Sequence, residues 1–306
     1  MQFWIKAIAS ALAIMTASTG SAQAAPANFF LMNNLGNVFE YAPPSNSTER
    51  LVAAGHNAST VFTFAPDGNS IFIARDDAFQ EYDLNGSLLT NVVNVGPGCC
   101  NSIIDIEFGP NGNLYVLDNL SHIFEINPTN GAQISLHADG FGPLRAFTFA
   151  PNGNIFAARD NGYQQFDASG TLITNILNLN LAPLDGILDI EWGPDGLIYL
   201  MNEIGNIRGY VPGTATPGGP TIATPNNSTD FTFSPMGTIF VARDGAYREY
   251  GTDGTLLQNV IGLGLAPNDS VRDIAFAPVP LPAAWSLLGL ALVSLGAAGR
   301  AQKRRG

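Results

Sequence analysis

The sequence predicts an all-β fold, a β-propeller of six four-stranded blades, and three observations lead to this prediction. A short strand motif that ends in proline recurs six times along the chain. The composition, with 33 Gly, 20 Pro and only 12% charged residues, suits many short strands joined by tight turns. Finally, the repetitive part of the chain begins and ends in the middle of a repeat, so that its two ends can complete one blade and close a ring.

The recurring motif sets the size of the repeat. Its six copies are Phe62–Pro66, Ile106–Pro110, Phe147–Pro151, Ile190–Pro194, Phe231–Pro235 and Ile274–Pro278. Successive prolines lie 44, 41, 43, 41 and 43 residues apart. A period near this length is typical of a four-stranded propeller blade.

Within the first complete repeat, turn chemistry separates four strands. We expect an inner strand at Thr60–Ala65, a second at Ser70–Arg75, a third at Phe79–Asp83 and an outer one at Leu88–Val93. The turns contain Asp-Gly or Asn-Gly pairs, which supply the positive φ angles of tight hairpins. Inner strands are expected to be apolar on both faces, because each blade is packed between two others.

Alternate repeats resemble each other more than neighbours do. Ala-Arg-Asp recurs every 84 residues, ending at Asp76, Asp160 and Asp244, and the other repeat type carries Asp105, Asp189 and Asp273 at the same interval. The ring is therefore predicted to be three copies of a two-blade unit.

The two ends of the repetitive region predict how the ring closes. The last repeat stops after its inner strand at Pro278, whereas Asn28–Leu35 aligns with Asn113–Leu120, which follows an inner strand. We expect the N-terminal strands and the C-terminal inner strand to share one blade. This arrangement removes exposed sheet edges without a disulfide.

Outside the predicted propeller, residues 25–278, both ends read as targeting segments. Residues 1–24 combine Lys6, an apolar run and the small-residue site Ala22-Gln23-Ala24, which predicts a signal peptide cleaved after Ala24; the alternative is a transmembrane anchor. Leu281–Gly299 is apolar, uncharged and long enough to span a bilayer as a helix, and a basic tail follows it.

The C-terminal segment, residues 279–306, resembles the sorting signals of PEP-CTERM proteins, in the variant with a Val-Pro-Leu-Pro-Ala motif. The motif residues are Val279, Pro280, Leu281, Pro282 and Ala283. The resemblance implies recognition by an exosortase-type membrane enzyme and delivery to the cell envelope, surface or extracellular matrix of a Gram-negative bacterium. The alternative is a permanent single-span anchor.

The charge of the predicted propeller excludes one class of partner. Residues 25–278 contain eight arginines, no lysine and all 25 acidic residues of the chain, a net charge of −17. Such a surface is repelled by phosphate backbones, which argues against nucleic-acid binding, and by anionic lipid surfaces. Membrane contact is expected only through the C-terminal helix before processing.

The Pro-Asn-Gly-Asn-Leu-Tyr-Val stretch at Pro110–Val116 resembles NHL-type propeller repeats, loosely along residues 25–278. That resemblance implies a fold used mostly for binding proteins, glycans or nucleic acids, with some related six-bladed propellers acting as lactonases or lyases. It carries over no catalytic residue.

Recurring charges give the candidate binding residues, which we expect at one rim near the propeller axis. These are Arg75, Asp76, Asp105, Arg159, Asp160, Asp189, Arg243, Asp244 and Asp273. One interpretation is structural, with ion pairs between blades. The other is an axial ligand or cation site to which Glu107 and Glu191 add oxygen donors, although Ala275 breaks the threefold pattern.

The histidines and cysteines do not form a recognisable catalytic group in the sequence. His56, His122 and His137 occupy non-equivalent positions, and we expect solvated turn or strand-end residues rather than a metal site. Cys99 and Cys100 are adjacent, so that a bridge between them would be strained; a free pair or an intermolecular link is equally open.

These observations predict an exported, non-enzymatic binding or structural protein whose rigid propeller face binds a glycan such as exopolysaccharide, a peptide or another protein. No cofactor is expected. The alternative is a propeller enzyme, such as a lactonase or lyase that depends on a divalent cation such as calcium.

Overall fold

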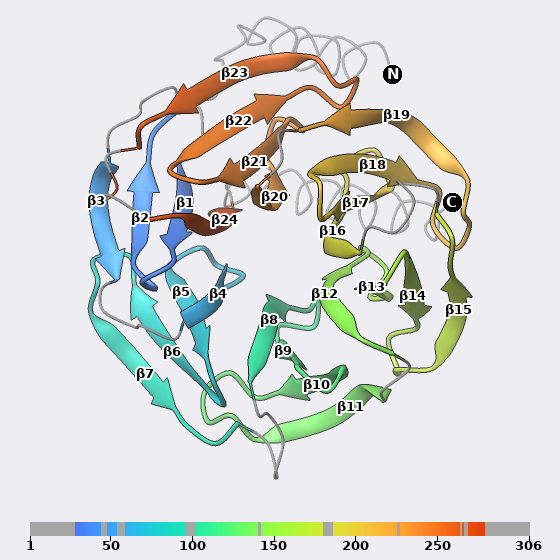
Figure 1. Cartoon of the computed structure of the whole chain (residues 1–306). Helices are drawn as coiled ribbons and strands as arrows, with labels where there is room; N and C mark the ends of the chain where they lie inside the picture. The colour runs from blue at the N-terminus through green and yellow to red at the C-terminus, as the bar shows by residue number, and fades with distance from the viewer. Residues whose placement is uncertain are drawn as a thin grey trace, which may run out of the picture.

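In the part of the chain that the structure describes, twenty-four strands form six four-stranded antiparallel sheets around a central axis (Figure 1). The computed structural model describes residues 28–43, 48–53, 59–95, 102–139, 142–179, 186–224, 227–263, 265 and 269–278. The predicted signal peptide with Ala24, the sorting motif, His56, Cys99 and Cys100 lie outside the described residues. No helix in the described ranges has the length and apolar character to cross a bilayer.

Each blade has one strand at each of four radial positions. The innermost strands are β24 (Val271–Phe276), β4 (Ser59–Phe64), β8 (Ile103–Phe108), β12 (Leu144–Phe149), β16 (Ile187–Trp192) and β20 (Ser228–Phe233). The second strands are β1 (Phe29–Asn33), β5 (Ser70–Arg75), β9 (Leu114–Asp118), β13 (Ile155–Arg159), β17 (Ile198–Asn202) and β21 (Ile239–Arg243).

Two further strands complete each blade toward the circumference. The third strands are β2 (Val38–Tyr41), β6 (Ala78–Asp83), β10 (His122–Ile126), β14 (Gly162–Phe166), β18 (Asn206–Tyr210) and β22 (Ala246–Tyr250). The outer strands are β3 (Thr48–Ala53), β7 (Leu88–Val92), β11 (Gln133–Asp139), β15 (Leu172–Ile176), β19 (Pro217–Ala223) and β23 (Leu256–Ile261).

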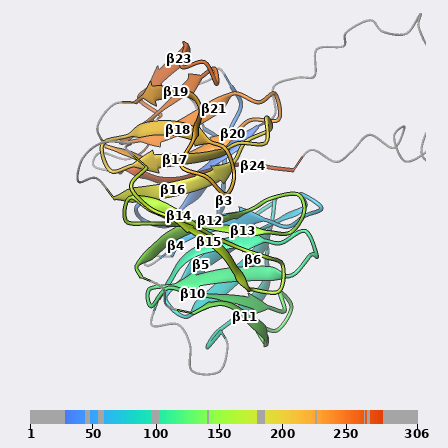
Figure 2. The ribbon, with the colours of Figure 1, turned by 90° about the vertical axis from the view of Figure 1, so that its right-hand side faces the viewer.

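We number the blades in chain order: blade 1 contains β24 and β1–β3, and blades 2 to 6 contain β4–β7, β8–β11, β12–β15, β16–β19 and β20–β23. Figure 2 shows the ring from the side, with β23 and β11 at opposite edges. The predicted fold, six blades of four strands, is confirmed.

The ring closes where the sequence predicts. Strand β24 pairs with β1, placing Phe29 opposite Phe276 and Met32 opposite Asp273. Phe29 also stacks on Tyr41 and meets Phe240 of blade 6 at a centroid distance of 5.5 Å. The closing blade is therefore held by main-chain pairing and by an aromatic cluster that reaches the neighbouring blade.

The hydrophobic core is divided among the interfaces between blades. Each of six buried clusters joins the facing sides of two adjacent blades, as in the cluster that packs Phe72 of blade 2 against Ile106 of blade 3. Glycine in a turn also lets the outer hairpins of adjacent blades approach each other closely. At Gly86, with φ of 88°, a Cβ would lie 2.7 Å from the Val52 carbonyl oxygen of blade 1. A side chain there would push two blades apart.

Candidate functional site: the axial channel and its rim

A channel of about 580 Å³ runs between the six inner strands and is lined by carboxyl groups. The expectation that inner strands are apolar on both faces is wrong, because one side of four of them carries aspartate beside the channel. At this position the six blades hold, in order, Asp273, Val61, Asp105, Ala146, Asp189 and Asp230. Two residues further along, blades 3 and 5 add Glu107 and Glu191.

The aspartates bind backbone N–H groups of the inner strands. Asp105 Oδ2 accepts from the Phe147 N–H of the next blade at an N–O distance of 2.7 Å, and its Oδ1 accepts from Ile106 at 2.8 Å. Asp189 repeats this arrangement with Phe231, at 3.2 Å, and Ile190, at 2.7 Å. Each carboxylate thus joins two inner strands.

Asp230 and Asp273 each reach forward to the next blade. Asp230 Oδ2 accepts from the Ile274 N–H at 2.8 Å, and Asp273 Oδ2 accepts from the Phe62 N–H at 2.6 Å. Four aspartates therefore satisfy the equivalent N–H in all six blades. Blades 2 and 4 carry Val61 and Ala146 at this position, so they offer no carboxylate to the blade that follows. In those following blades, 3 and 5, the N–H donates to the second oxygen of the blade's own aspartate.

These hydrogen bonds explain why acidic residues sit at the axis. An inner strand is the free edge of its sheet, and an N–H that faces away from the sheet needs an acceptor when buried. One interpretation of the recurring charges was that these aspartates form ion pairs with the rim arginines. The structure instead shows backbone N–H groups that donate to these carboxylates across the blade boundary.

Burial and mutual repulsion raise the pKa values of these carboxyl groups above the ordinary range. Burial raises the pKa of Asp105 to about 8 against the opposing hydrogen bonds from Phe147 and Ile106, and the charge of Asp189 adds to the rise. Burial likewise raises the pKa of Asp273 to about 6 and that of Asp189 above its ordinary value. The channel therefore holds fewer charges at neutral pH than its six carboxyl groups suggest.

Asp230 links two of the other carboxyl groups. Burial, followed by the charges of Asp189 and Asp273, raises its pKa well above the usual range, and its side chain hydrogen-bonds with both neighbours. Asp230 thus lies between carboxyl groups from blades 5 and 1. Asp230 was absent from the sequence-based candidates, although it follows Asp189 by 41 residues, close to the single-blade period.

Glu107 and Glu191 lie deeper along the channel. Burial raises the pKa of both well above the ordinary value, followed by the charges of neighbouring aspartates. Hydrogen bonds from the Thr148 hydroxyl and the Phe149 backbone oppose the rise at Glu107, whose Oε2 is buried without a hydrogen-bond partner.

The carboxyl cluster does not form a ready metal site. Among the described residues, no group of three His, Cys, Asp or Glu side chains is placed to hold a metal ion. The aspartate oxygens are directed at backbone N–H groups instead. These oxygens are therefore occupied by main-chain donors.

Two arginines stand at one mouth of the channel. Arg145 and Arg272 directly precede the channel-facing positions of blades 4 and 1, which lie opposite each other in the ring, and both line the cavity. Arg145 is half exposed and approaches Glu203 Oε1 at 3.7 Å. Neither arginine was among the sequence-based candidates, because neither takes part in the threefold repeat.

The repeated Arg-Asp turns lie at the same end of the inner strands. Arg75, Arg159 and Arg243 end the second strands and pair with the first residues of β4, β12 and β20. The aspartates that follow, Asp76, Asp160 and Asp244, are exposed. An ion pair of 3.2 Å joins Arg159 to its own neighbour Asp160.

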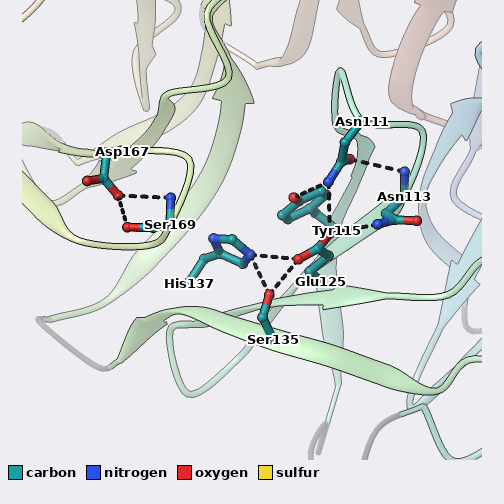
Figure 3. A network of polar contacts seen from close by, with 8 residues as sticks. All are labelled: Asn111, Asn113, Tyr115, Glu125, Ser135, His137, Asp167 and Ser169. Carbon is teal, nitrogen blue, oxygen red and sulfur yellow. Dashed lines mark hydrogen bonds and ion pairs between the residues drawn. The ribbon is translucent and has the colours of Figure 1, made fainter.

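Blade 3 contains a second polar network, shown in Figure 3. Glu125 Oε2 accepts from the Ser135 hydroxyl at 2.5 Å and lies 3.0 Å from His137 Nε2. Ser135 Oγ lies 2.6 Å from that same nitrogen, while His137 Nδ1 is buried and unpartnered. Because Ser135 and Glu125 share one ring nitrogen, the three residues lack the relay geometry of a hydrolase triad.

This network stabilises a carboxylate rather than a nucleophile. Burial of Glu125 opposes ionisation, but hydrogen bonds led by those from Ser135 and His137 lower its pKa to about 2. The expectation of solvated histidines is wrong for His137, which is 4% exposed because the neighbouring blade covers it at Gly170. His122 opens β10, half buried, and its Nδ1 lies 3.0 Å from Asp118 Oδ2.

The fold and channel define this chain as a six-bladed β-propeller protein. A chain of a nidogen/laminin complex aligns with a TM-score of 0.65 and 12% identity, covering 82% of this chain and 98% of the other. A protein of unknown function from Bacteroides caccae aligns with a TM-score of 0.62 and 11% identity, covering 81% and 98%. At these identities the similarity shows the fold alone. No family model and no curated protein matches the sequence.

Proposed function

We propose that this chain is an exported cell-surface or extracellular-matrix protein whose propeller face binds a glycan, peptide or protein. One observation carries the proposal. A rigid closed ring presents Arg145 and Arg272 from opposite blades at the mouth of its channel, above carboxyl groups already used in holding the blades together. The mouth is therefore the part of the axis left for a ligand.

The arginines favour a ligand with acidic groups. A guanidinium group binds carboxylates in a two-pronged geometry, and the acidic interior disfavours passage of an anion beyond the mouth. A glycan or peptide that offers an isolated carboxylate has the required chemistry, whereas a uniformly anionic polymer would be repelled by the net charge of −17. The presence of a propeller in a nidogen/laminin complex supports a binding role by analogy of fold only.

The binding experiment uses the full-length protein and exopolysaccharide from the producing cells, measured by biolayer interferometry. The double variant Arg145→Met, Arg272→Met should bind at least about tenfold more weakly, because each lost charge-assisted hydrogen bond costs roughly 1.5–3 kcal/mol. Arg248→Met is the matched control, since Arg248 lies on β22 and bonds to Asn259 at 3.0 Å. Unchanged binding by the double variant would refute the ligand site.

Export is proposed from the two ends of the chain. We expect the secreted protein to begin at Ala25 and to lose its tail near Val279–Ala283 through an exosortase-type enzyme. N-terminal sequencing and intact-mass measurement of protein from cells with and without that enzyme test this. A mature protein that retains Met1 would contradict the signal peptide, and an uncleaved tail in both strains would favour the permanent anchor.

The enzyme alternative is tested on the same preparation. A cation-dependent lactonase or lyase requires a stoichiometric divalent ion, and elemental analysis of the purified protein detects one. Glycan binding that persists in chelator supports the binding protein, whereas a bound ion that chelator removes together with activity supports the enzyme.

A further inference from the structure

A second layer of side chains surrounds the channel beyond the axial aspartates. Two residues after the aspartate position, each inner strand pairs with an aromatic residue of the second strand, so these six positions are equivalent. Side chains two residues apart on a strand lie on the same face, so this layer is directed toward the axis as the aspartates are. In the order of blades 1 to 6 it consists of Ala275, Thr63, Glu107, Thr148, Glu191 and Thr232, of which all but Thr148 line the cavity.

The glutamates of this layer are not used in joining blades as the aspartates are. Both oxygens of Asp105 accept from backbone N–H groups. Glu107 receives hydrogen bonds from Thr148 and Phe149, yet its Oε2 is buried without a partner. Buried acceptors in folded proteins are normally hydrogen-bonded, so an unpaired one beside a cavity needs a donor that enters the cavity.

The glutamates are reached from the end of the channel opposite Arg145 and Arg272. At the arginine end, the aspartates leave only the mouth for a ligand. At the other end, where the inner strands finish, the cavity is bordered by Pro66, Pro110 and Pro278.

The face at this second end is negatively charged. Its turns join first to second and third to fourth strands, and hydrogen bonds within the turns hold the pKa values of four aspartates below the ordinary range. These are Asp67, Asp83, Asp167 and Asp253. They are ionised at neutral pH, and such a face attracts cations and repels anions.

The acceptors of the second layer suit a primary ammonium group. Such a group has three N–H donors and no acceptor. The layer offers it the carboxyl oxygens of Glu107 and Glu191, and the hydroxyl oxygens of Thr63 and Thr232. Hydrogen bonds from an ammonium group to a carboxylate are roughly twice as strong as those between neutral groups. The small side chain of Ala275 leaves room for an aliphatic chain on the side of blade 1.

We propose that the second layer binds the ammonium group of a slender aliphatic amine, with Glu107 and Glu191 as its ionic partners. The cavity of about 580 Å³ has space for such a chain. A free alkylamine and the lysine side chain of another protein share this chemistry. The site lies at the opposite end of the channel from the arginines and takes a ligand of opposite charge, so it is distinct from the one proposed above.

The first experiment compares two ligands by isothermal titration calorimetry of the full-length protein in a nonionic detergent. Butylammonium and butyltrimethylammonium have the same charge and the same chain, but only the first has N–H donors. We expect one butylammonium per chain, bound at least about tenfold more tightly than the trimethyl compound. Equal affinities would mean that the negative face attracts any cation, and this result, like the absence of binding, would overturn the proposal.

The second experiment uses matched substitutions. Glu107→Gln with Glu191→Gln should weaken butylammonium binding at least about tenfold. Burial raises the pKa of both glutamates well above the ordinary value, so glutamine replaces a neutral carboxyl and the ring should stay folded. The control is Glu81→Gln with Glu249→Gln, an equal change of charge on β6 and β22, where each carboxylate accepts from a hydroxyl at 2.8 and 2.7 Å. Equal loss of affinity in the two double variants would contradict the site.

Proton release gives an independent measurement. Because the channel glutamates are protonated without the ligand, a bound cation ionises them, and the measured enthalpy should vary with the ionisation enthalpy of the buffer. The turn aspartates are already ionised and would bind a cation without this dependence. An enthalpy that is the same in all buffers would place the cation on the outer face and refute the assignment to the channel.

A blocked Gly-Lys-Gly peptide distinguishes the two sources of the ammonium group. Binding of both the peptide and butylammonium assigns the site to a lysine side chain of a partner protein, whereas binding of butylammonium alone assigns it to a free amine. None of these results bears on Arg145 and Arg272, whose proposed ligand carries a carboxylate, so the two proposals fail independently.

Discussion

Asp273 is the carboxylate that joins the closing blade to blade 2. Two substitutions of this residue distinguish its contribution as a hydrogen-bond acceptor from the effect of its buried charge. Its Oδ2 accepts from the Phe62 N–H at 2.6 Å, and its side chain hydrogen-bonds with Asp230. Asp273→Ala removes the acceptor and the charge together. Asp273→Asn removes the charge but keeps a carbonyl oxygen for Phe62, while its N–H₂ group takes the place of the oxygen that accepts from Asp230.

The magnitudes follow from these contacts. An N–H left buried without an acceptor costs about 1–3 kcal/mol, so Asp273→Ala should lower the free energy of unfolding by about 2 kcal/mol. For a ring of this size that corresponds to a fall in Tm of about 4–8 °C. Asp273→Asn should cost clearly less than Asp273→Ala, because the Phe62 N–H keeps an acceptor and repulsion from Asp189 is relieved.

The assay is denaturant unfolding at neutral pH with hydrogen exchange at the Phe62 amide. Exchange of that amide should accelerate in the alanine variant and stay slow in the asparagine variant. Asp244→Ala, at an exposed rim position, is the control and should change stability by less than about 0.5 kcal/mol. If asparagine destabilises as much as alanine, the charge rather than the acceptor holds the blades, and our account of the axis is wrong.

Three further predictions concern stability. Because the folded pKa of Asp105, about 8, exceeds its ordinary value of 3.8, the native state binds the extra proton between these values. The free energy of unfolding should therefore fall by up to about 1.4 kcal/mol per pH unit over this range as pH rises, and Asp105→Asn should flatten the slope in a pH series of denaturant titrations. Phe29→Ala should cost about 3–5 kcal/mol by emptying the aromatic cluster at the closure, measured by calorimetry; a cost below about 1 kcal/mol would contradict that role. Glu125→Gln should destabilise the protein at neutral pH by roughly 1.5–3 kcal/mol. That difference should fade as pH falls from 4.5 through about 2, where the wild-type carboxylate loses its charge; a difference independent of pH would count against it.

The repeat period, the strand positions within a blade and the way the ring closes could all be predicted from the sequence. In the first complete blade the predicted strands match β4–β7 to within a residue at each end. The pairing of β1 with β24 was equally predictable, because two half-repeats at the ends of the repetitive region complete one repeat. Turn residues and alternating apolar residues determine strands and turns within a few positions of the chain, so these elements can be predicted without knowledge of tertiary contacts.

The partners of the charged side chains could not be predicted in this way. The recurrence of Asp105, Asp189 and Asp273 marked them as special, but an ion pair with the rim arginines and a bond to the next blade's backbone give the same sequence pattern. The choice depends on where the next inner strand places its free N–H. Arg145 and Arg272 likewise meet at one mouth of the channel only because blades 1 and 4 face each other across the axis.

The sequence by itself thus determined the number of blades, their order and their closure, since these follow from local periodicity and from where the chain begins and ends its repeats. Only the tertiary structure decided that the axial aspartates serve as acceptors for the inner edges and that His137 is buried. Those outcomes depend on groups more than one strand apart in sequence, whose distance is fixed by the curvature of the closed ring.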